Sequence, residues 1–412
     1  MSLNSQQEAA LKQMLDFVLV SNDTYFVLDG MAGCGKTFLV SYFLERLAEI
    51  YITMKDINVE VINYTNMLCA PTHKAVDALK DATVLPAETI HSALHLTIRR
   101  DYEKNTQYLM RRNDASIQHL KLILIDEASF IDETLIKYIA KGTDSCKIIY
   151  MGDPAQLRPV DSLNCPVFNK GYETAKLTQI MRQADNNPIQ KFSVGLRDYV
   201  LGNKFPDVDL VPGHIELLSP QDFLAELTKE MSRPDWHYKD SKFLAWTNKR
   251  VIAANSYISN IVRGRPDFQA GDYATNNHHV QGNRHRLKTD ENVHILTMSP
   301  PTTMYGVAGK YVNIHSHQYF LPDDPSQIEK AGKAQHALGN THNVQVIHEN
   351  WIDLRPEFAC TVNKSQGSTY GTVFIDLDDI SKCKDVDLRR RMLYVAVSRA
   401  RTRVVMMGAY KS

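Results

Sequence analysis

The stretch Gly30-Met31-Ala32-Gly33-Cys34-Gly35-Lys36-Thr37 decides the fold of the first part of this 412-residue chain. An apolar run at residues 25–28 precedes it, and a helical spacing of apolar residues follows over residues 39–47. This order of strand, glycine-rich turn and helix is the context that the phosphate-loop motif G-x-x-x-x-G-K-[ST] requires. Glycines let backbone N–H groups surround phosphates, and the helix N-terminus adds further donors. The stretch therefore predicts a nucleoside triphosphate site.

Two side chains of this loop carry the chemistry that a bound triphosphate requires. Lys36 is expected to reach the β- and γ-phosphates, and the Thr37 hydroxyl is expected to bind Mg²⁺. An ordinary glycine turn is the alternative interpretation, and it would need neither role. If the loop binds ATP, its other residues contact the cofactor as well, namely Gly30, Ala32, Gly33, Cys34, Gly35 and Phe38.

A second buried strand ends in two carboxylates and supplies the other half of a nucleotide site. Residues 122–125 are apolar, and Asp126 and Glu127 follow directly. Asp126 would hold Mg²⁺, directly or through water, and Glu127 would orient or deprotonate the attacking water. A third strand, at residues 147–151, leads to Gln156, which could contact the γ-phosphate or that water.

The composition indicates a globular protein with more than one domain. A chain of 412 residues favours two to four domains. Hydrophobic residues make up 43% and charged residues 23% of the chain, as in folded proteins. The apolar runs fall far short of the ~20 residues that cross a bilayer, and the N-terminus lacks an export signal. No membrane association is therefore expected.

Cysteine spacing and net charge limit the location and the partners. The six cysteines show no C-x-x-C spacing, so we expect reduced thiols and a cytoplasmic protein, in the host cytoplasm if it is viral. Lys plus Arg and Asp plus Glu both number 47, which gives a net charge of zero. Nucleic-acid binding would therefore depend on local features rather than on the overall field.

Polar segments also follow other predicted strands of the first half. A strand at residues 66–70 ends in a Pro-Thr-His sequence, and a Thr/His pair occurs about twenty residues later. Carboxyl ends of parallel strands form the ligand-binding edge of an α/β sheet. Residues 96–112 alternate around a polar centre, which favours a projecting β-hairpin whose tyrosines, Tyr102 and Tyr108, could stack on bases.

The second half shows another α/β pattern that begins at Lys242 and has no phosphate loop of its own. Predicted strands at residues 243–245, 373–376 and 404–407 alternate with helices at 248–258 and 388–398. A sheet of this kind suggests a nucleotide site shared across a cleft. Arg182 and Arg399 would then act as arginine fingers that stabilise the transferring charge.

The segment at residues 278–350 differs from its surroundings because it is rich in His, Asn and Thr. Short β-like runs occur at residues 292–298, 311–314 and 343–347. We interpret this segment as a small β-domain inserted into the second α/β pattern.

Seven segments together resemble the motifs of superfamily-one helicases in their order and approximate spacing. They are residues 30–37, 70–75, 122–127, 152–160, 177–182, 361–367 and 393–401. Their wording is most similar to the RecD/Dda-like subgroup, and the resemblance covers nearly the whole chain but is weakest over residues 278–350. It implies an ATP-dependent DNA helicase that moves 5′→3′ along single-stranded DNA and unwinds duplex, in phage-type DNA replication or recombination.

The same resemblance implies an α/β fold of two RecA-like P-loop domains with parallel sheets. Domain 1 would span residues 1–185 and carry a hairpin, the pin, at about 95–115. Domain 2 would consist of residues 186–277 and 351–412, and residues 278–350 would form an SH3-like module that braces the pin. Single-stranded DNA and single-strand/duplex junctions are the implied partners, a single-strand binding protein is a further one, and a monomer is expected.

Matching positions imply roles for individual residues. Gln7 would read the adenine, Gly367 would contact the cofactor, and Tyr108 would be the wedge of the pin. The residues implied to act on the γ-phosphate, the water or the transition state are Lys36, Glu127, Gln156, Arg182 and Arg399. The residues implied to contact DNA are Pro71, Thr72, His73, Thr89, His91, Tyr108, Asn248, Thr361 and Lys364.

The sequence departs from the subgroup at two positions, and three other functions are alternatives. Asn363 stands where the subgroup usually has His, and Cys34 replaces a commoner small or hydroxyl residue. The alternatives are a 3′→5′ helicase of the UvrD kind, a DNA-stimulated ATPase that does not unwind, and a non-enzymatic DNA-binding module. The complete set of Lys36, Asp126 and Glu127 favours hydrolysis over the last of these.

Overall fold

The computed structural model describes residues 3–83, 85–101, 106–112, 116–159, 162, 164–179, 187–281 and 286–410. Its contacts separate two compact units, Met1–Pro206 and Asp207–Ser412. The separation lies after Pro206 rather than near residue 185. The reason is that Arg197, in the helix α6 (Pro188–Val200), forms ion pairs with Asp29 and Asp153 of the first unit.

The first unit is built on a six-stranded sheet in which all neighbouring strands are parallel. The strands, in the spatial order β10-β1-β9-β7-β2-β3, are Glu173–Leu177, Tyr25–Gly30, Lys147–Gly152, Lys121–Ile125, Thr65–Ala70 and Ala87–Thr89. Along β1, Phe26 and Leu28 pack in one hydrophobic cluster and Val27 packs in another. Both faces of the sheet are covered, which explains why its central strands are continuous apolar runs.

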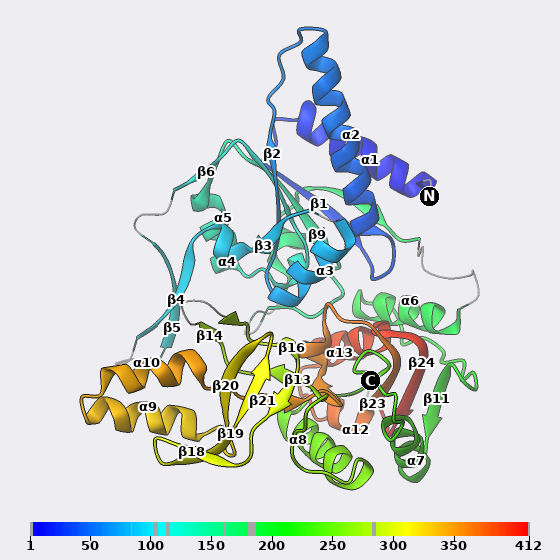
Figure 1. Ribbon diagram of the computed structural model, residues 1–412. Helices are drawn as coiled ribbons and strands as arrows, with labels where there is room; N and C mark the ends of the chain where they lie inside the picture. Colours follow the sequence, from blue (N-terminus) through cyan, green and yellow to red (C-terminus); the bar gives the residue numbers. More distant parts are fainter. Residues whose placement is uncertain are drawn as a thin grey trace. The chain divides into compact units, whose positions relative to one another are not determined.

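Helices cover the two faces of this sheet. Helices α1 (Ser5–Leu19), α2 (Lys36–Asp56) and α3 (His73–Thr83) pack in the cluster that contains Phe26 (Figure 1). Helices α4 (Ile90–Ala93) and α5 (Glu133–Gly142) pack in the cluster that contains Val27. The remaining short elements of the unit are η1 (Ala128–Phe130), η2 (Pro166–Asn169), β6 (Gln118–His119) and β8 (Thr143–Asp144).

The predicted hairpin is present in the first unit. Strands β4 (Leu96–Asp101) and β5 (Thr106–Arg111) pair antiparallel, with Arg99 opposite Tyr108. Helix α5 holds the base of the hairpin, because the Tyr138 hydroxyl donates a hydrogen bond to the Leu109 carbonyl at 2.5 Å. The hairpin therefore extends from a fixed attachment on the parallel sheet domain.

The second unit contains a five-stranded, all-parallel sheet. Its strands, in the spatial order β11-β24-β23-β12-β22, are Ile215–Leu218, Ala400–Met407, Tyr370–Asp376, Ser241–Ala245 and Ala359–Thr361. Its helices are α7 (Pro220–Met231), α8 (Asn248–Tyr257), the π-helix η3 (Ile258–Val262), α11 (Val362–Ser365), α12 (Leu377–Ile380) and α13 (Val386–Ser398). The predicted strands and helices of this pattern are confirmed, but β11 and α7 precede Lys242, so the sheet begins earlier than predicted.

A small antiparallel β module interrupts the second sheet between β12 and β22. Its strands are β13 (Tyr273–Asn276), β14 (Val280–Gln281), β15 (Arg286–Leu287), β16 (Glu291–His294), β17 (Thr297–Met298), β18 (Thr302–Met304), β19 (Val307–Ile314), β20 (His317–Pro322) and β21 (Leu354–Pro356). The β-like runs predicted at residues 292–298 and 311–314 lie in β16, β17 and β19.

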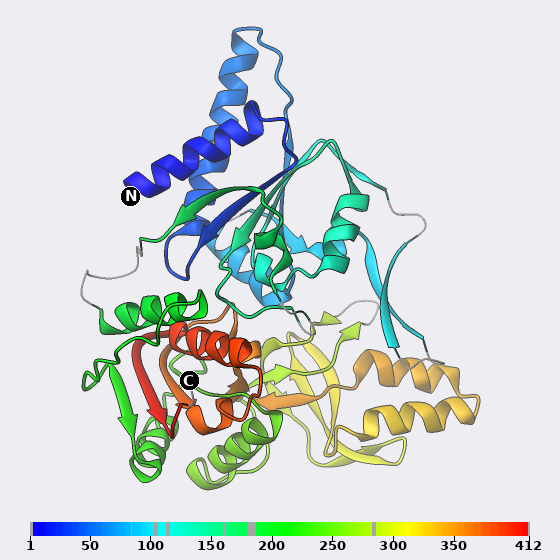
Figure 2. The ribbon, with the colours of Figure 1, turned by 180° about the vertical axis from the view of Figure 1, so that it is seen from behind.

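The strand predicted at residues 343–347 is wrong, because these residues belong to helix α10 (Thr341–Asn350). Helices α9 (Gln327–Ala337) and α10 lie side by side at the edge of the small β module (Figure 2). Ile347 is fully buried in a cluster with Trp351 and Phe320. Burial of Ile347 against Phe320 of β20, a contact that forms only in the folded chain, overrides the local β-like pattern.

Candidate nucleotide site and nucleic-acid interface

The predicted phosphate loop joins β1 to α2 in the first unit. Gly33 and Gly35 adopt left-handed φ values of 84° and 80°, which glycine tolerates without strain. A Cβ on Gly30 would lie 2.6 Å from the Cys34 Sγ, so the loop closes tightly on itself. Helix α2 starts after Gly35 with no side-chain cap, so its first N–H groups are available to a phosphate.

Lys36 lies across this loop in the first turn of α2. Its Nζ donates hydrogen bonds to the carbonyls of Gly30 at 2.5 Å and Met31 at 3.1 Å. Burial lowers the pKa of Lys36, but the nearby Cys34, Asp126 and other acidic groups outweigh this effect and raise the pKa overall. The ammonium is therefore charged at neutral pH, as a phosphate-binding lysine has to be.

Asp126 and Glu127 follow the buried strand β7, as predicted. The Asp126 N–H donates to the Cys69 carbonyl of β2 at 2.9 Å, which fixes the end of the strand. Burial raises the pKa of the Asp126 carboxyl, and Lys36 opposes that shift. Glu127 has a φ of 52°, an uncommon conformation for a residue other than glycine and one found at functional sites.

Gln156 lies in the turn after β9. Its side chain is almost fully buried, and its N–H donates to the Asp153 carbonyl at 3.1 Å. Asp153 in turn pairs with Arg197, and so does Asp29 at the end of β1. Sequence reasoning missed all three of these charged residues; Asp153 belonged to a quoted motif segment, whereas Arg197 carries no local signal.

Gln7, predicted to read adenine, is buried in α1. Its side-chain oxygen accepts from the Asn4 N–H at 3.1 Å, and its Nε2 donates to the Cys34 carbonyl at 3.4 Å. The structure therefore places Gln7 directly against the phosphate loop, with its amide already engaged within the protein. Its neighbour Gln6 instead bonds to Thr178 and Gln179, at the start of the predicted arginine-finger segment.

The predicted DNA contacts of the first unit come together at one sheet edge. Strands β2 and β3 are parallel neighbours with Ala70 opposite Thr89. Thr72 and Thr89 each accept a hydrogen bond from the backbone of the helix that follows. Burial lowers the pKa of His91, with Asp132 opposing, so its imidazole is neutral at neutral pH. Pro71 and His73, also predicted, follow the end of β2, so all of these residues lie at the carboxyl ends of two neighbouring strands.

In the second unit, three predicted DNA contacts line one pocket of about 310 Å³. They are Asn248 at the start of α8, Thr361 at the end of β22 and Lys364 in α11. The same pocket is lined by polar residues that sequence reasoning missed, namely Asn255, Thr275, Asn277 and Arg355. Asn277 and Arg355 flank or belong to the β module, so only the folded chain brings them to this pocket.

Lys364, in α11 beside the second parallel sheet, bonds to residues of the small β module. Its Nζ lies 2.8 Å from an Asp290 carboxylate oxygen and 3.1 Å from the Asn277 side-chain oxygen. The predicted arginine finger Arg399 is almost fully buried and donates to the Ser368 carbonyl and to the Ser398 hydroxyl. Gly367 lies one residue before Ser368 and has a left-handed φ of 78°.

Some predicted residues cannot be compared with the structure. Arg182 and Tyr102 lie outside the described residues, and of Tyr108 only the backbone in β5 is described. Among the residues that the structure describes, no helix combines the length and the apolar character needed to cross a membrane.

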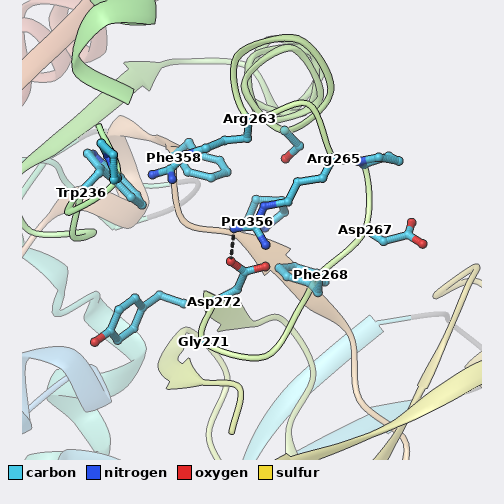
Figure 3. A pocket seen from close by; sticks show the side chains of 13 residues that line it. Trp236, Arg263, Arg265, Asp267, Phe268, Gly271, Asp272, Pro356 and Phe358 are labelled. Carbon is cyan, nitrogen blue, oxygen red and sulfur yellow. Dashed lines mark hydrogen bonds and ion pairs between the residues drawn. The ribbon is translucent and has the colours of Figure 1, made fainter. Parts of the chain in front are cut away.

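A further pocket of about 150 Å³ in the second unit contains none of the predicted residues. The Trp236 and Phe358 rings pack together with their centroids 4.8 Å apart, and the Arg263 guanidinium lies over both, 5.4 Å and 5.6 Å from the two centroids (Figure 3). Burial and the neighbouring Arg265 lower the pKa of Arg263. Arg265 pairs with Asp272 at 2.7 Å across the pocket wall. Stacking and pairing therefore occupy both of its arginines.

Two known families match separate parts of the chain, one in each of the two units. Residues 2–204 match the family described as AAA domain. Residues 357–407 match the family described as UvrD-like helicase C-terminal domain. The phosphate loop, Asp126, Glu127 and Gln156 lie in the first match, and Lys364 and Arg399 lie in the second.

Individual relatives match over nearly the whole chain. The ATP-dependent DNA helicase dda of Enterobacteria phage T4 is 25% identical over 92% of this chain and 93% of the relative. The ATP-dependent RecD2 DNA helicase of Deinococcus radiodurans is 25% identical over 99% of this chain but only 49% of the relative. A solved structure of Pif1 helicases at forked double-stranded DNA covers 100% of this chain and 93% of that one, with a TM-score of 0.57 at 16% identity. This last match shows the fold, which is that of two RecA-like domains.

Proposed function

Because this chain belongs to the RecD/Dda-like group of superfamily-one DNA helicases, we propose that it uses ATP to move 5′→3′ along single-stranded DNA and to separate duplex strands. One observation carries the proposal. The phosphate loop, with Lys36 near Asp126, Glu127 and Asp153, lies in the same chain as a second parallel sheet with a pocket lined by Asn248, Thr361 and Lys364.

The nucleotide would bind to the first unit. The N–H groups of the glycine loop and of the first turn of α2 would hold the phosphates, and Lys36 would exchange its bonds to Gly30 and Met31 for bonds to the β- and γ-phosphates. Glu127 would accept a proton from the attacking water, and Gln156 would contact the γ-phosphate side.

The donor set beside the loop fits Mg²⁺. Thr37 offers a hydroxyl oxygen and Asp126 a carboxylate oxygen, which are the hard ligands that Mg²⁺ prefers. The metal, when bound with ATP, would neutralise developing phosphate charge. Burial disfavours ionisation of Asp126 in the protein alone, and a cation would reverse that preference.

Single-stranded DNA would lie against the surface of Thr72, His73, Thr89 and His91 in the first unit and in the pocket of Lys364 in the second. Main-chain and hydroxyl donors suit a phosphate backbone read without sequence preference. The 5′→3′ direction and a monomeric motor follow from the resemblance to the subgroup, and the hairpin supports action at single-strand/duplex junctions.

Strand separation on two matched duplexes tests this proposal. One duplex carries a 5′ single-stranded tail and the other a 3′ tail, each with ATP and Mg²⁺, and Lys36→Ala serves as the inactive control. Unwinding of the 5′-tailed duplex alone, lost in the control, is the expected result. Unwinding from the 3′ tail would overturn the polarity, and ATP hydrolysis without separation of either duplex would overturn the unwinding activity.

A further inference from the structure

We propose that Arg197 is a positioning residue that holds the phosphate loop and the Gln156 turn in one fixed arrangement; this inference rests on the proposed ATP hydrolysis. Its Nη2 lies 2.9 Å from the Asp29 Oδ1, and its Nε lies 3.0 Å from the Asp153 Oδ1. The Arg197 and Asp29 side chains are nearly buried, at 10% and 13% exposure, and that of Asp153 is fully buried.

The two carboxylates need such a partner because of their place in the sheet. Asp29 of β1 stands opposite Gly152 of β9, so Asp29 and Asp153 lie close together at the carboxyl edge. Burial raises the pKa of Asp29, Arg197 opposes that shift, and Asp153 adds to it. A guanidinium bridges two such acceptors with its fixed fork, which the single ammonium of a lysine does not reproduce.

Each carboxylate is attached to one half of the nucleotide site. Asp29 precedes Gly30, whose carbonyl accepts a hydrogen bond from Lys36. The Asp153 Oδ1 accepts from the Ala155 N–H at 3.1 Å, and the Asp153 carbonyl accepts from the Gln156 N–H at 3.1 Å. Arg197 therefore sets the distance between the loop that would bind the phosphates and the turn that would contact the γ-phosphate.

Arg197 also links this site to the end of the first unit. It lies in α6, the last helix before the division after Pro206. A Cβ on Gly195 of α6 would lie 2.6 Å from the Pro206 Cβ, and Tyr199 packs edge-on against Phe205. The segment that continues into the second unit is thus packed against the helix that holds both halves of the nucleotide site.

The first test compares Arg197→Lys with Arg403→Lys. Arg403 is a matched control because it also bridges two carboxylates, Glu216 and Glu226, but on β24 of the second sheet. We expect Arg197→Lys to remain folded, to lower kcat for ATP hydrolysis by about tenfold or more, and to weaken nucleotide binding. Arg403→Lys should leave both unchanged, and unchanged kcat and nucleotide affinity in Arg197→Lys would overturn the proposal.

A double-mutant cycle separates positioning from a general structural effect. In a Gln156→Ala background, Arg197→Lys should lower kcat by less than about threefold, because the group that it positions is already absent. Losses that simply multiply would overturn the proposed action through Gln156.

Asp29→Asn serves as a second variant should Arg197→Lys not fold. Because Asp29 directly precedes the phosphate loop, whereas Asp153 holds the Gln156 turn, this variant should raise KM for ATP more than it lowers kcat, and an unchanged KM would contradict the inference. Nucleotide affinity is measured by titration without hydrolysis. If the wild-type protein bound ATP but did not unwind duplex, the proposed function would be contradicted. The effect of Arg197→Lys on nucleotide affinity would still test the present inference.

Discussion

The residues of the phosphate loop are packed so closely that Gly30 has no room for a side chain. The position that a Cβ on Gly30 would take lies 2.6 Å from the Cys34 Sγ and 3.2 Å from atoms of Leu177 and Lys36. Cys34 is buried, and burial raises the pKa of its thiol, with Lys36 opposing. The cysteine that departs from the subgroup therefore acts here as a small packed residue rather than as a thiolate.

Replacing Gly30 by Ala tests this packing. We expect Gly30→Ala to lower the free energy of unfolding by about 1–3 kcal/mol and to weaken ATP binding, because the added methyl group displaces Cys34. Adding Cys34→Ala should restore part of both losses. Gly332→Ala is the control, since a Cβ at that helical glycine meets nothing within 4 Å. Thermal unfolding and nucleotide titration measure both effects, and no recovery in the double variant would contradict the explanation.

At the scale of elements, the turn between β12 and α8 depends on Asp379 of α12. Its carboxylate accepts from the N–H groups of Trp246 and Thr247, at 3.0 Å and 2.7 Å, and from the Thr247 hydroxyl. Thr247 caps α8, which begins with the predicted DNA contact Asn248. Asp379 thus fixes the helix start that presents Asn248 to the pocket.

The stability of this turn should depend on pH. Burial raises the pKa of Asp379, but the hydrogen bonds from Thr247 and Lys382 outweigh burial and lower it overall, below the ordinary value of 3.8. The stabilisation is therefore present above about pH 4 and is lost as pH falls through the lowered pKa. Asp379→Asn should cost about 2 kcal/mol at pH 7, and the difference from wild type should shrink towards pH 3. Urea unfolding measures this difference, with Asp81→Asn, at an exposed position of α3, as control; a difference independent of pH would contradict it.

The hairpin formed by β4 and β5 is a second element with a testable role. If the Tyr108 ring separates strands, Tyr108→Ala should cut unwinding while leaving DNA-stimulated ATP hydrolysis intact. Tyr108→Phe should keep unwinding, because stacking on bases uses the ring and not the hydroxyl. Helicase and ATPase assays on the same tailed duplex decide this, and unchanged unwinding by Tyr108→Ala would reject the role.

The whole molecule has no net charge, so its attraction to DNA has to be local. Lys364 lines the predicted DNA pocket and pairs with Asp290. Lys364→Ala should weaken binding to single-stranded DNA and reduce the slope of log affinity against log salt by about 1. Lys333→Ala is matched, because Lys333 pairs with Glu329 in α9 and does not line that pocket. A slope unchanged by Lys364→Ala, measured by titration at several salt concentrations, would remove this residue from the DNA contacts.

The local elements of both parallel sheets were predictable from the chain because their causes are local. The strand, glycine turn and helix around Lys36 follow from apolar periodicity and from backbone conformations that glycine tolerates. The same reasoning placed Asp126, Glu127 and Gln156 after their strands and the hairpin near residues 96–112. It failed for α10, where buried contacts of Ile347 with distant residues override a β-like pattern.

Tertiary contacts decided the connections between these elements. Arg197 lies 168 positions from Asp29 and 44 from Asp153, and nothing in the sequence near Arg197 marks it as part of a nucleotide site. Asn277, Asp290 and Lys364 likewise meet only because the small β module folds against α11. The chain specifies which residues end its strands, since backbone geometry is local. Which charged side chains then form ion pairs depends on which of them are buried next to one another. That arrangement exists only in the folded protein.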